Sequence, residues 1–262
     1  MNTRTAQFPS LESIYDAAEC LRGVAYHTPL MENLILSERY QANIFLKRED
    51  LQIVRSYKIR GAYNKMVKLS KEALNKGVVC ASAGNHAQGF AYSCKKLNTK
   101  GVVFMPVITP NQKINQTKMF GEDFIEVKLV GDTFDDCAFA AKKYTEENGM
   151  TFIPPFDDIR IIEGQGTVGV EILEELPEID YLFVPVGGGG LSAGVGSYFK
   201  TYSPKTKIVG LEPEGAPSMY EALKAGHPVT VENIDRFVDG AAVKRVGDVT
   251  FNICKDVLDD MH

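Results

Sequence analysis

The 262-residue sequence predicts an α/β fold, in which a mostly parallel sheet is flanked by helices on both faces. Short apolar runs typical of strands alternate along the chain with longer segments of helical spacing, which indicates strand–helix–strand units. The sequence contains no internal repeats and no low-complexity segments. Such sheets bind ligands at the carboxyl ends of their strands, so a functional site is expected where strands run into loops.

The individual elements follow from periodicity and from the residues that start or stop them. Leu11 and Leu21 bound a segment of helical spacing that Ser10 precedes as an N-cap, and Gly121 and Gly149 end two later helices. The expected helices are residues 11–21, 59–69, 85–97, 112–120, 134–148, 167–176 and 191–202. The expected strands are residues 43–48, 77–81, 101–106, 124–129, 151–153, 181–186 and 207–211.

Near the end of the chain, an apolar stripe predicts one further helix that continues to the last residues. The stripe consists of Val249, Phe251, Cys254, Val257, Leu258 and Met261.

Composition excludes several classes of protein. A hydrophobic content of 44% and a charged content of 24% are those of a soluble globular protein, and the net charge of -5 argues against a nucleic-acid surface. No apolar run reaches the roughly 18 residues that span a membrane, and residues 1–10 lack the apolar stretch of a signal peptide. The five cysteines have neither disulfide-framework nor zinc-site spacing. We therefore expect a cytoplasmic protein without metal.

Two glycine-containing loops connect a predicted strand to a predicted helix. One is Ser82-Ala83-Gly84-Asn85-His86, and the other is Gly187-Gly188-Gly189-Gly190-Leu191. A helix N-terminus has unpaired N–H groups and a partial positive charge, and glycine lets the backbone approach a ligand closely. Both loops are therefore candidate phosphate or carboxylate sites. The alternative is that the glycines only form tight turns and close helix contacts.

The second loop also matches two other motifs. Gly188-x-Gly190-x-x-Ala193 fits the loose dinucleotide fingerprint, with Glu212 after the next strand as the ribose-binding acid of an NAD-dependent dehydrogenase. A second motif, Gly190-Leu-Ser192-Ala-Gly194, fits the nucleophile elbow of a hydrolase. The hydrolase would need a later Asp and His, such as Asp235 and His262, but a terminal residue such as His262 is poorly held. Short motifs of this kind often match by chance, so both are kept only as minor alternatives, and Ser192 is expected to lie in the first turn of a helix.

Six segments in the same order resemble the second fold type of pyridoxal-phosphate enzymes, most closely the biosynthetic threonine dehydratases. The resemblance extends from about residue 10 to the end of the chain. Its segments are His27-Thr-Pro-Leu30, Leu46-Lys-Arg-Glu-Asp-Leu-Gln52, Ser56-Tyr-Lys-Ile-Arg-Gly-Ala62, Ser82-Ala-Gly-Asn-His-Ala-Gln-Gly89, Gly164-Gln-Gly-Thr167 and Val186-Gly-Gly-Gly-Gly-Leu191. Each is weak alone, and six in order are specific. The resemblance implies two open, mostly parallel sheets with flanking helices, as in the β subunit of tryptophan synthase.

The resemblance also implies a role for each matching site residue. Lys58 is expected to form the Schiff base with pyridoxal 5'-phosphate, and Asn85 to hydrogen-bond the ring's 3-hydroxyl. Gly187 to Leu191 are expected to hold the phosphate through backbone N–H groups. The loop from Ser82 to His86, through Ala83, Gly84 and Asn85, is expected to surround the substrate carboxylate.

The chemistry of Lys58 is consistent with this role. A Schiff base needs a neutral amine, whereas the pKa of a free lysine is about 10.4. Lys58 lies at a predicted helix start, where the dipole and burial both disfavour the ammonium, and Arg60 is expected to add to the effect if it points inward. Most lysines are solvated surface charges, and periodicity alone does not single out Lys58.

The activity implied by the resemblance is β-elimination of an amino-acid substrate, which converts L-threonine to 2-oxobutanoate and ammonia and L-serine to pyruvate. Ala83 stands where similar serine racemases have a second serine as acid, so we expect elimination without efficient racemisation. Glu212 and Ala216 align with the first two metal ligands of the racemases, but Ser218 replaces the third. No metal is expected.

The resemblance further implies a large cofactor-binding domain of residues 1–70 plus 159–262, a small domain of residues 78–155, and a homo-oligomer, dimer or tetramer. Relatives continue past the point that corresponds to His262, with more sheet, a serine on the cofactor's pyridine nitrogen and, in biosynthetic members, an isoleucine-sensing domain. The large domain is therefore expected to be incomplete at its C-terminus. A truncated, non-catalytic fragment that binds the cofactor is the alternative function, and the dehydrogenase is a distant third.

Overall fold

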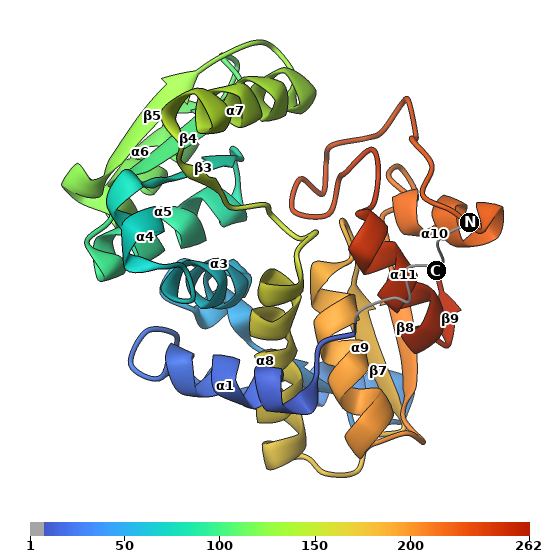
Figure 1. Cartoon of the computed structure of the whole chain (residues 1–262). Helices are drawn as coiled ribbons and strands as arrows, with labels where there is room; N and C mark the ends of the chain where they lie inside the picture. Colours follow the sequence, from blue (N-terminus) through green and yellow to red (C-terminus); the bar gives the residue numbers. More distant parts are fainter. Residues whose placement is uncertain (1–7) are drawn as a thin grey trace, which may run out of the picture.

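A computed structural model describes residues 8–262, and the first seven residues, part of the polar stretch considered for a signal peptide, lie outside it. Helices and parallel strands form two lobes with the long helix α8 (Ile159–Glu175) between them (Figure 1). The predicted α/β architecture with two open parallel sheets is confirmed. Within the described residues, no helix is both long and apolar enough to cross a bilayer.

The first lobe is built on a four-stranded parallel sheet with the order β5-β4-β3-β6. Its strands are β3 (Val78–Ala81), β4 (Gly101–Met105), β5 (Ile125–Leu129) and β6 (Thr151–Phe152). Its helices are α4 (Lys71–Lys76), α5 (Asn85–Leu97), α6 (Asn111–Gly121) and α7 (Phe134–Asn148), with a 3-10 turn, η2 (Glu122–Phe124). Alternate residues of β3 and β4 enter two separate cores: Cys80 and Val103 pack with Phe90 of α5, and Val79 and Val102 with α7.

The second lobe contains a three-stranded parallel sheet with the order β7-β8-β9. Its strands are β7 (Tyr181–Pro185), β8 (Lys207–Leu211) and β9 (Asp260–Met261), and its helices are α9 (Gly190–Tyr202), α10 (Ser218–Ala225) and α11 (Asp248–Val257). Near α8 lie α1 (Leu11–Leu21) and α3 (Lys58–Val67). The core of this lobe joins Val184 and Ile208 of the sheet to Val195 and Phe199 of α9 and to Val168 of α8.

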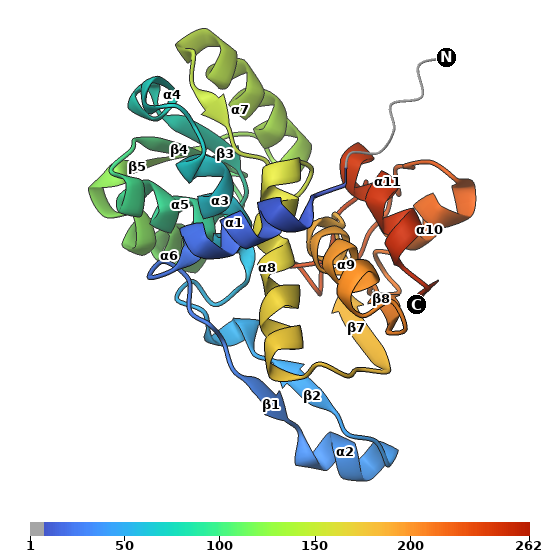
Figure 2. The same ribbon diagram turned by 60° about the horizontal axis from the view of Figure 1, so that its bottom comes forward.

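An arm formed by β1 (Leu30–Glu32), α2 (Leu34–Tyr40) and β2 (Phe45–Lys47) projects from the body, followed by a 3-10 turn, η1 (Glu49–Leu51) (Figure 2). The strand predicted at residues 43–48 is this β2, but it pairs antiparallel with β1 and joins neither parallel sheet. Helix α2 was not expected, because none of its residues is buried and periodicity detects helices through a buried face.

Two other predictions were wrong at helix ends. Helix α8 begins at Ile159, not at residue 167, because Gly164 and Gly166 interrupt the pattern that predicts a helix. These glycines allow close packing: a Cβ on Gly164 would lie 2.5 Å from the carbonyl oxygen of Arg60 in α3. The last helix, α11, ends at Val257, and Met261 lies on strand β9, where it pairs with Gly210.

Candidate active site

A cavity of about 660 Å³ lies between the two lobes, and it is lined by every site residue predicted from the sequence. This volume is within the range typical of small-molecule sites. The predicted residues that line it are Lys58, Ser82, Ala83, Gly84, Asn85, His86, Gly187, Gly188, Gly189, Gly190 and Leu191. Three separate parts of the chain therefore meet in this cavity, and two of them, the loops after β3 and β7, lie at the carboxyl ends of parallel strands.

Lys58 is the first residue of α3, and its Nζ donates a hydrogen bond to the carbonyl oxygen of Pro155 at 2.8 Å. The side chain retains some accessible surface toward the cavity, although protein surrounds it on every other side. Burial lowers the pKa of Lys58 from 10.5 to about 8. At pH 7 roughly a tenth of this amine is therefore unprotonated, far more than for a solvated lysine, and this fraction is able to act as a nucleophile.

Arg60 does not act on Lys58 in the way that the sequence suggested. Its side chain is 1% exposed, and its guanidinium forms paired hydrogen bonds with both Glu49, at 2.9 and 2.7 Å, and Glu171, at 2.5 and 2.9 Å. Thr167 accepts a further hydrogen bond from Arg60. Two carboxylates thus neutralise the guanidinium, and burial is the cause of the lowered pKa of Lys58.

The loop from Ser82 to His86 leads from β3 into α5. Asn85 is the first residue of the helix, no side chain caps this N-terminus, and the Ser82 hydroxyl accepts the N–H of Gly84 at 3.2 Å. The first N–H groups of a helix have no partner within the helix, so those of Asn85 and His86 are suited to an anion in the cavity. The side chain of Asn85 is exposed where it meets the cavity.

His86 has a different environment from the rest of this loop. Its imidazole is buried, and Nε2 lies 3.0 Å from the carbonyl oxygen of Ile153, to which it donates as the neutral tautomer. Burial first and the nearby Lys58 second lower the pKa of His86 to about 3. The ring therefore carries no charge at neutral pH, so His86 offers an anion its backbone N–H and no imidazolium.

The glycine loop follows β7 and opens α9, and it needs glycine for steric reasons. A Cβ on Gly188 would lie 2.3 Å from the ring of Phe156, and one on Gly187 would lie 2.8 Å from the carbonyl oxygen of Ala241. Gly189 has a φ of 89°, in the left-handed region that favours glycine. The backbone of this loop therefore faces the cavity without side chains.

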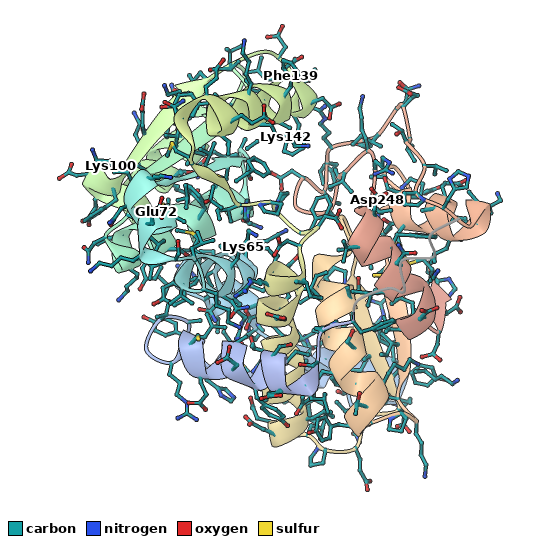
Figure 3. All side chains as sticks on the ribbon, in the orientation of Figure 1. Lys65, Glu72, Lys100, Phe139, Lys142 and Asp248 are labelled. Atoms are coloured by element: carbon teal, nitrogen blue, oxygen red, sulfur yellow. The ribbon has the colours of Figure 1, made fainter. Side chains whose placement is uncertain are left out.

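Sequence reasoning missed the segment that crosses between the lobes, residues 153–158. Pro155 accepts the hydrogen bond of Lys58, and Phe156 packs against Gly188 and lines the cavity. Asp157 accepts backbone N–H groups at the start of α11, and Asp158 caps α8 and pairs with Lys65, whose side chain on α3 is labelled in Figure 3. No periodicity marks this segment, and its roles depend on contacts between residues far apart in sequence.

The mouth of the cavity was also missed. The long segment from Gly226 to Gly247 reaches toward the first lobe (Figure 1), and Asp239 in it pairs with Lys113 of α6. Arg236 and Lys244 of the same segment line the cavity. The segment has little regular structure, so its position depends on tertiary contacts, which no sequence pattern predicts.

The hydrolase and dehydrogenase motifs do not form the sites that they suggested. The Ser192 hydroxyl is fully buried and donates to the carbonyl oxygen of Gly189 at 3.1 Å, while His262 pairs with Asp260. The carboxylate of Glu212 accepts backbone N–H groups of Met219 and Tyr220 and so caps α10. Neither a nucleophile elbow with its triad nor a free ribose-binding acid results.

The fold and the cavity, which is lined by a partly buried lysine and by a glycine loop, define a pyridoxal-phosphate enzyme, and comparison with known proteins agrees. The family profile described as pyridoxal-phosphate dependent enzyme matches residues 21–262, and the chain belongs to this family. It is 56% identical over 252 residues to the biosynthetic L-threonine dehydratase of Halalkalibacterium halodurans. The matched region covers 96% of this chain and 61% of that relative. The corresponding enzyme of Bacillus subtilis is 54% identical, and the match covers 96% of this chain and 60% of that enzyme.

Solved structures show the same relationship. The processed form of threonine deaminase isoform 2 from Solanum lycopersicum has a TM-score of 0.91 and 47% identity, and the match covers 95% of this chain and 68% of that one. Maize serine racemase has a TM-score of 0.93 and 31% identity, and the match covers 97% of this chain and 76% of the racemase. The predicted second fold type is thus confirmed. The chain spans about three fifths of the length of the curated relatives it matches.

The residues around the cavity fit pyridoxal phosphate on structural grounds. The cofactor needs an amine that can lose its proton near physiological pH, and burial brings the pKa of Lys58 to about 8. It needs a phosphate site, and the backbone of Gly187 to Gly190 faces the cavity at the N-terminus of α9. Space for a ring is present near the first loop, because a Cβ on Gly84 would meet nothing within 4 Å.

Proposed function

We propose that this chain carries the site for pyridoxal-phosphate-dependent β-elimination of L-threonine, which yields 2-oxobutanoate and ammonia. L-Serine, which gives pyruvate, is the second substrate. The observation that carries the proposal is that the largely desolvated amine of Lys58 and the glycine loop line one cavity. That arrangement occurs in a chain more than half identical to biosynthetic L-threonine dehydratases.

In this proposal the cofactor is held at three points. Lys58 would bind its aldehyde carbon with loss of water, the N–H groups from Gly187 to Leu191 would bind its phosphate, and the Asn85 amide would donate to its 3-hydroxyl. When bound, pyridoxal phosphate supplies an electron sink for the pair released with the substrate's α-proton. Glycines at the cradle and an uncapped α5 N-terminus support these assignments.

The substrate carboxylate binds at the N-terminus of α5, between Ser82 and His86, where helix N–H groups and the partial positive charge favour an anion. Ala83 and Gly84 let it approach the backbone. The free Lys58 amine would remove the α-proton, and the resulting ammonium would return a proton to the β-hydroxyl, which leaves as water. His86 contributes through its backbone, because its neutral imidazole already donates to Ile153.

The lowered pKa of Lys58 predicts the pH dependence of cofactor capture. Only the neutral amine attacks an aldehyde, so the rate at which the visible band of lysine-bound cofactor appears should rise with pH and reach half its maximum near about 8. Stopped-flow absorbance between about pH 6 and about pH 10 measures this profile. A half-point above about 10 would show that Lys58 behaves as a solvated lysine.

The function itself is tested by incubating the purified chain with pyridoxal phosphate and L-threonine, and following 2-oxobutanoate. Formation of 2-oxobutanoate together with the visible band supports an active dehydratase. The band without product would support the alternative, a non-catalytic cofactor-binding fragment. A folded chain with no band contradicts both proposals.

The same assay with L-serine tests the role of Ala83. A methyl group cannot donate a proton to the face of the substrate opposite Lys58, so pyruvate should form with little D-serine. Chiral chromatography of the remaining serine measures the ratio. D-Serine in amounts comparable to pyruvate would contradict elimination without racemisation.

We also propose that the protein is cytoplasmic and that it self-associates as a dimer or tetramer. We propose two domains: a large one of residues 1–70 plus 159–262, and a small one of residues 78–155. Free cysteines at all five positions support a reducing compartment. The projecting arm supports self-association, because Leu34 is 71% and Ile35 is 78% exposed at its tip. Sedimentation velocity of the chain beside a Leu34→Glu variant would test this role of the arm.

A further inference from the structure

Two buried hydroxyl side chains, which do not line the cavity, donate hydrogen bonds to carbonyl groups of the glycine loop. Thr250 of α11 donates its Oγ1 hydrogen to the carbonyl oxygen of Gly188 at 2.6 Å. Ser192 of α9 donates to the carbonyl oxygen of Gly189 at 3.1 Å, and the backbone N–H of Ala193 donates to the same oxygen at 2.9 Å. Both side chains are fully buried, and neither lines the cavity.

The planarity of the peptide bond converts this anchoring into an orientation of the N–H groups. In a trans peptide the C=O and the following N–H point in opposite directions. Because the carbonyls of Gly188 and Gly189 are drawn toward α11 and the interior of α9, the N–H groups of Gly189 and Gly190 are directed to the other side. That side is the cavity, which both glycines line.

The anchor is itself held firmly. Asp157 accepts the backbone N–H groups of Val249 at 2.9 Å and Thr250 at 3.1 Å with one oxygen, and that of Asp248 at 3.1 Å with the other. Figure 3 labels Asp248 at this end of α11. Gly189 and Thr250 are packed in close contact, since a Cβ on Gly189 would lie 3.0 Å from the Cβ of Thr250.

We propose that Thr250, with Ser192 as a second anchor, is a positioning residue for the phosphate group of the cofactor. It touches no ligand and acts by fixing the peptide planes whose N–H groups bind the phosphate. Glycine lacks side-chain restraints, so a run of four glycines needs such external anchors to stay preorganised. The inference rests on the proposed function only in taking pyridoxal phosphate as the ligand of this cavity.

The test compares pyridoxal phosphate with pyridoxal, which has the same ring and aldehyde but no phosphate. Dissociation constants for both are measured by absorbance titration of the parent chain and of Thr250→Val, an isosteric change that removes only the hydroxyl. We expect affinity for pyridoxal phosphate to fall about tenfold while affinity for pyridoxal changes less than about twofold. Thr250→Ser keeps the hydroxyl, so it should restore the parent ratio of the two dissociation constants, that for pyridoxal phosphate to that for pyridoxal.

The matched control is Thr206→Val. Thr206 is also buried, at 1% exposure, and its hydroxyl donates to a backbone carbonyl, that of Ile179, at 2.7 Å in the same lobe. Thr206 does not line the cavity. The control should therefore lose stability to a similar degree, seen in thermal unfolding, without changing the ratio of the two dissociation constants.

Three results overturn the proposal. An unchanged ratio in Thr250→Val would show that the hydroxyl does not orient the cradle, and an equal loss for both ligands would show general damage to the site. If Thr250→Val does not fold, Ser192→Ala decides, and an unchanged ratio there also contradicts the inference. A parent chain that binds neither compound instead contradicts the proposed function, which separates the two failures.

Discussion

Replacing Lys58 with alanine is expected to abolish both the visible band of lysine-bound pyridoxal phosphate and the formation of 2-oxobutanoate. The variant lacks the amine with which α3 lines the cavity, and under the proposed function it also lacks the base that removes the α-proton. Loss of proton transfer alone costs about a hundredfold to ten-thousandfold in rate, and loss of the covalent bond adds to it. Absorbance spectra and a product assay measure the two losses.

The matched control is Lys65→Ala. Lys65 is on the same helix, but its Nζ pairs with Asp158 at 2.6 Å and does not line the cavity. We expect this variant to retain the band. A band of parental intensity in folded Lys58→Ala would show that another lysine, such as Lys113 at the cavity mouth, captures the cofactor.

Replacing Arg60 with methionine is expected to destabilise the fold by about 3–5 kcal/mol, the range for breaking a buried ion pair by removing one partner. Glu49 and Glu171 both direct their oxygens at this guanidinium, and the variant leaves them buried without it. Urea unfolding of parent and variant measures the difference. Arg48→Met is the control, because Arg48 forms its ion pair with Asp50 in an exposed position and should matter little.

The loss in Arg60→Met should depend on pH in a defined direction. Burial alone would raise the pKa of Glu171, but hydrogen bonds and charges from Arg60 and Lys47 hold it below its usual value. A carboxylate with a lowered folded pKa contributes stability above its unfolded pKa, and this contribution disappears as pH falls through the folded value. The difference between parent and variant should therefore shrink below about pH 4. A difference that stays constant with pH would assign the loss to packing.

The sequence was informative wherever burial imposed a period on it. Strand β8 and helix α7 lie where the pattern predicted them, because both bury one continuous apolar set. Helix α8 was shortened by two turns in the prediction, since its glycines serve close contact with α3 and weaken the helical pattern. Arm helix α2 was not predicted, because nothing in the described chain covers its apolar residues.

For the site, the glycine loops and Lys58 were predictable because their chemistry is local, whereas their supports were not. Pro155 and Thr250 act through single contacts with residues about 60 to 100 positions away in sequence, and no motif encodes such a contact. The environment of Arg60 is similar: the sequence supplied its charge, but only the fold supplied the two carboxylates that neutralise it.

The crossing segment of residues 153–158 limits how this protein can be rebuilt. Its six residues accept a hydrogen bond from His86 of one lobe and another from Lys58 of α3. They also pack against the glycine loop, and they cap α11 of the other lobe and α8 between the lobes. A chimera that exchanges the small lobe for that of a relative therefore cannot be joined within it. A junction before Thr151 or after Ile159 keeps the six residues of the segment from one parent sequence, and directed evolution of the lobe should leave the segment intact.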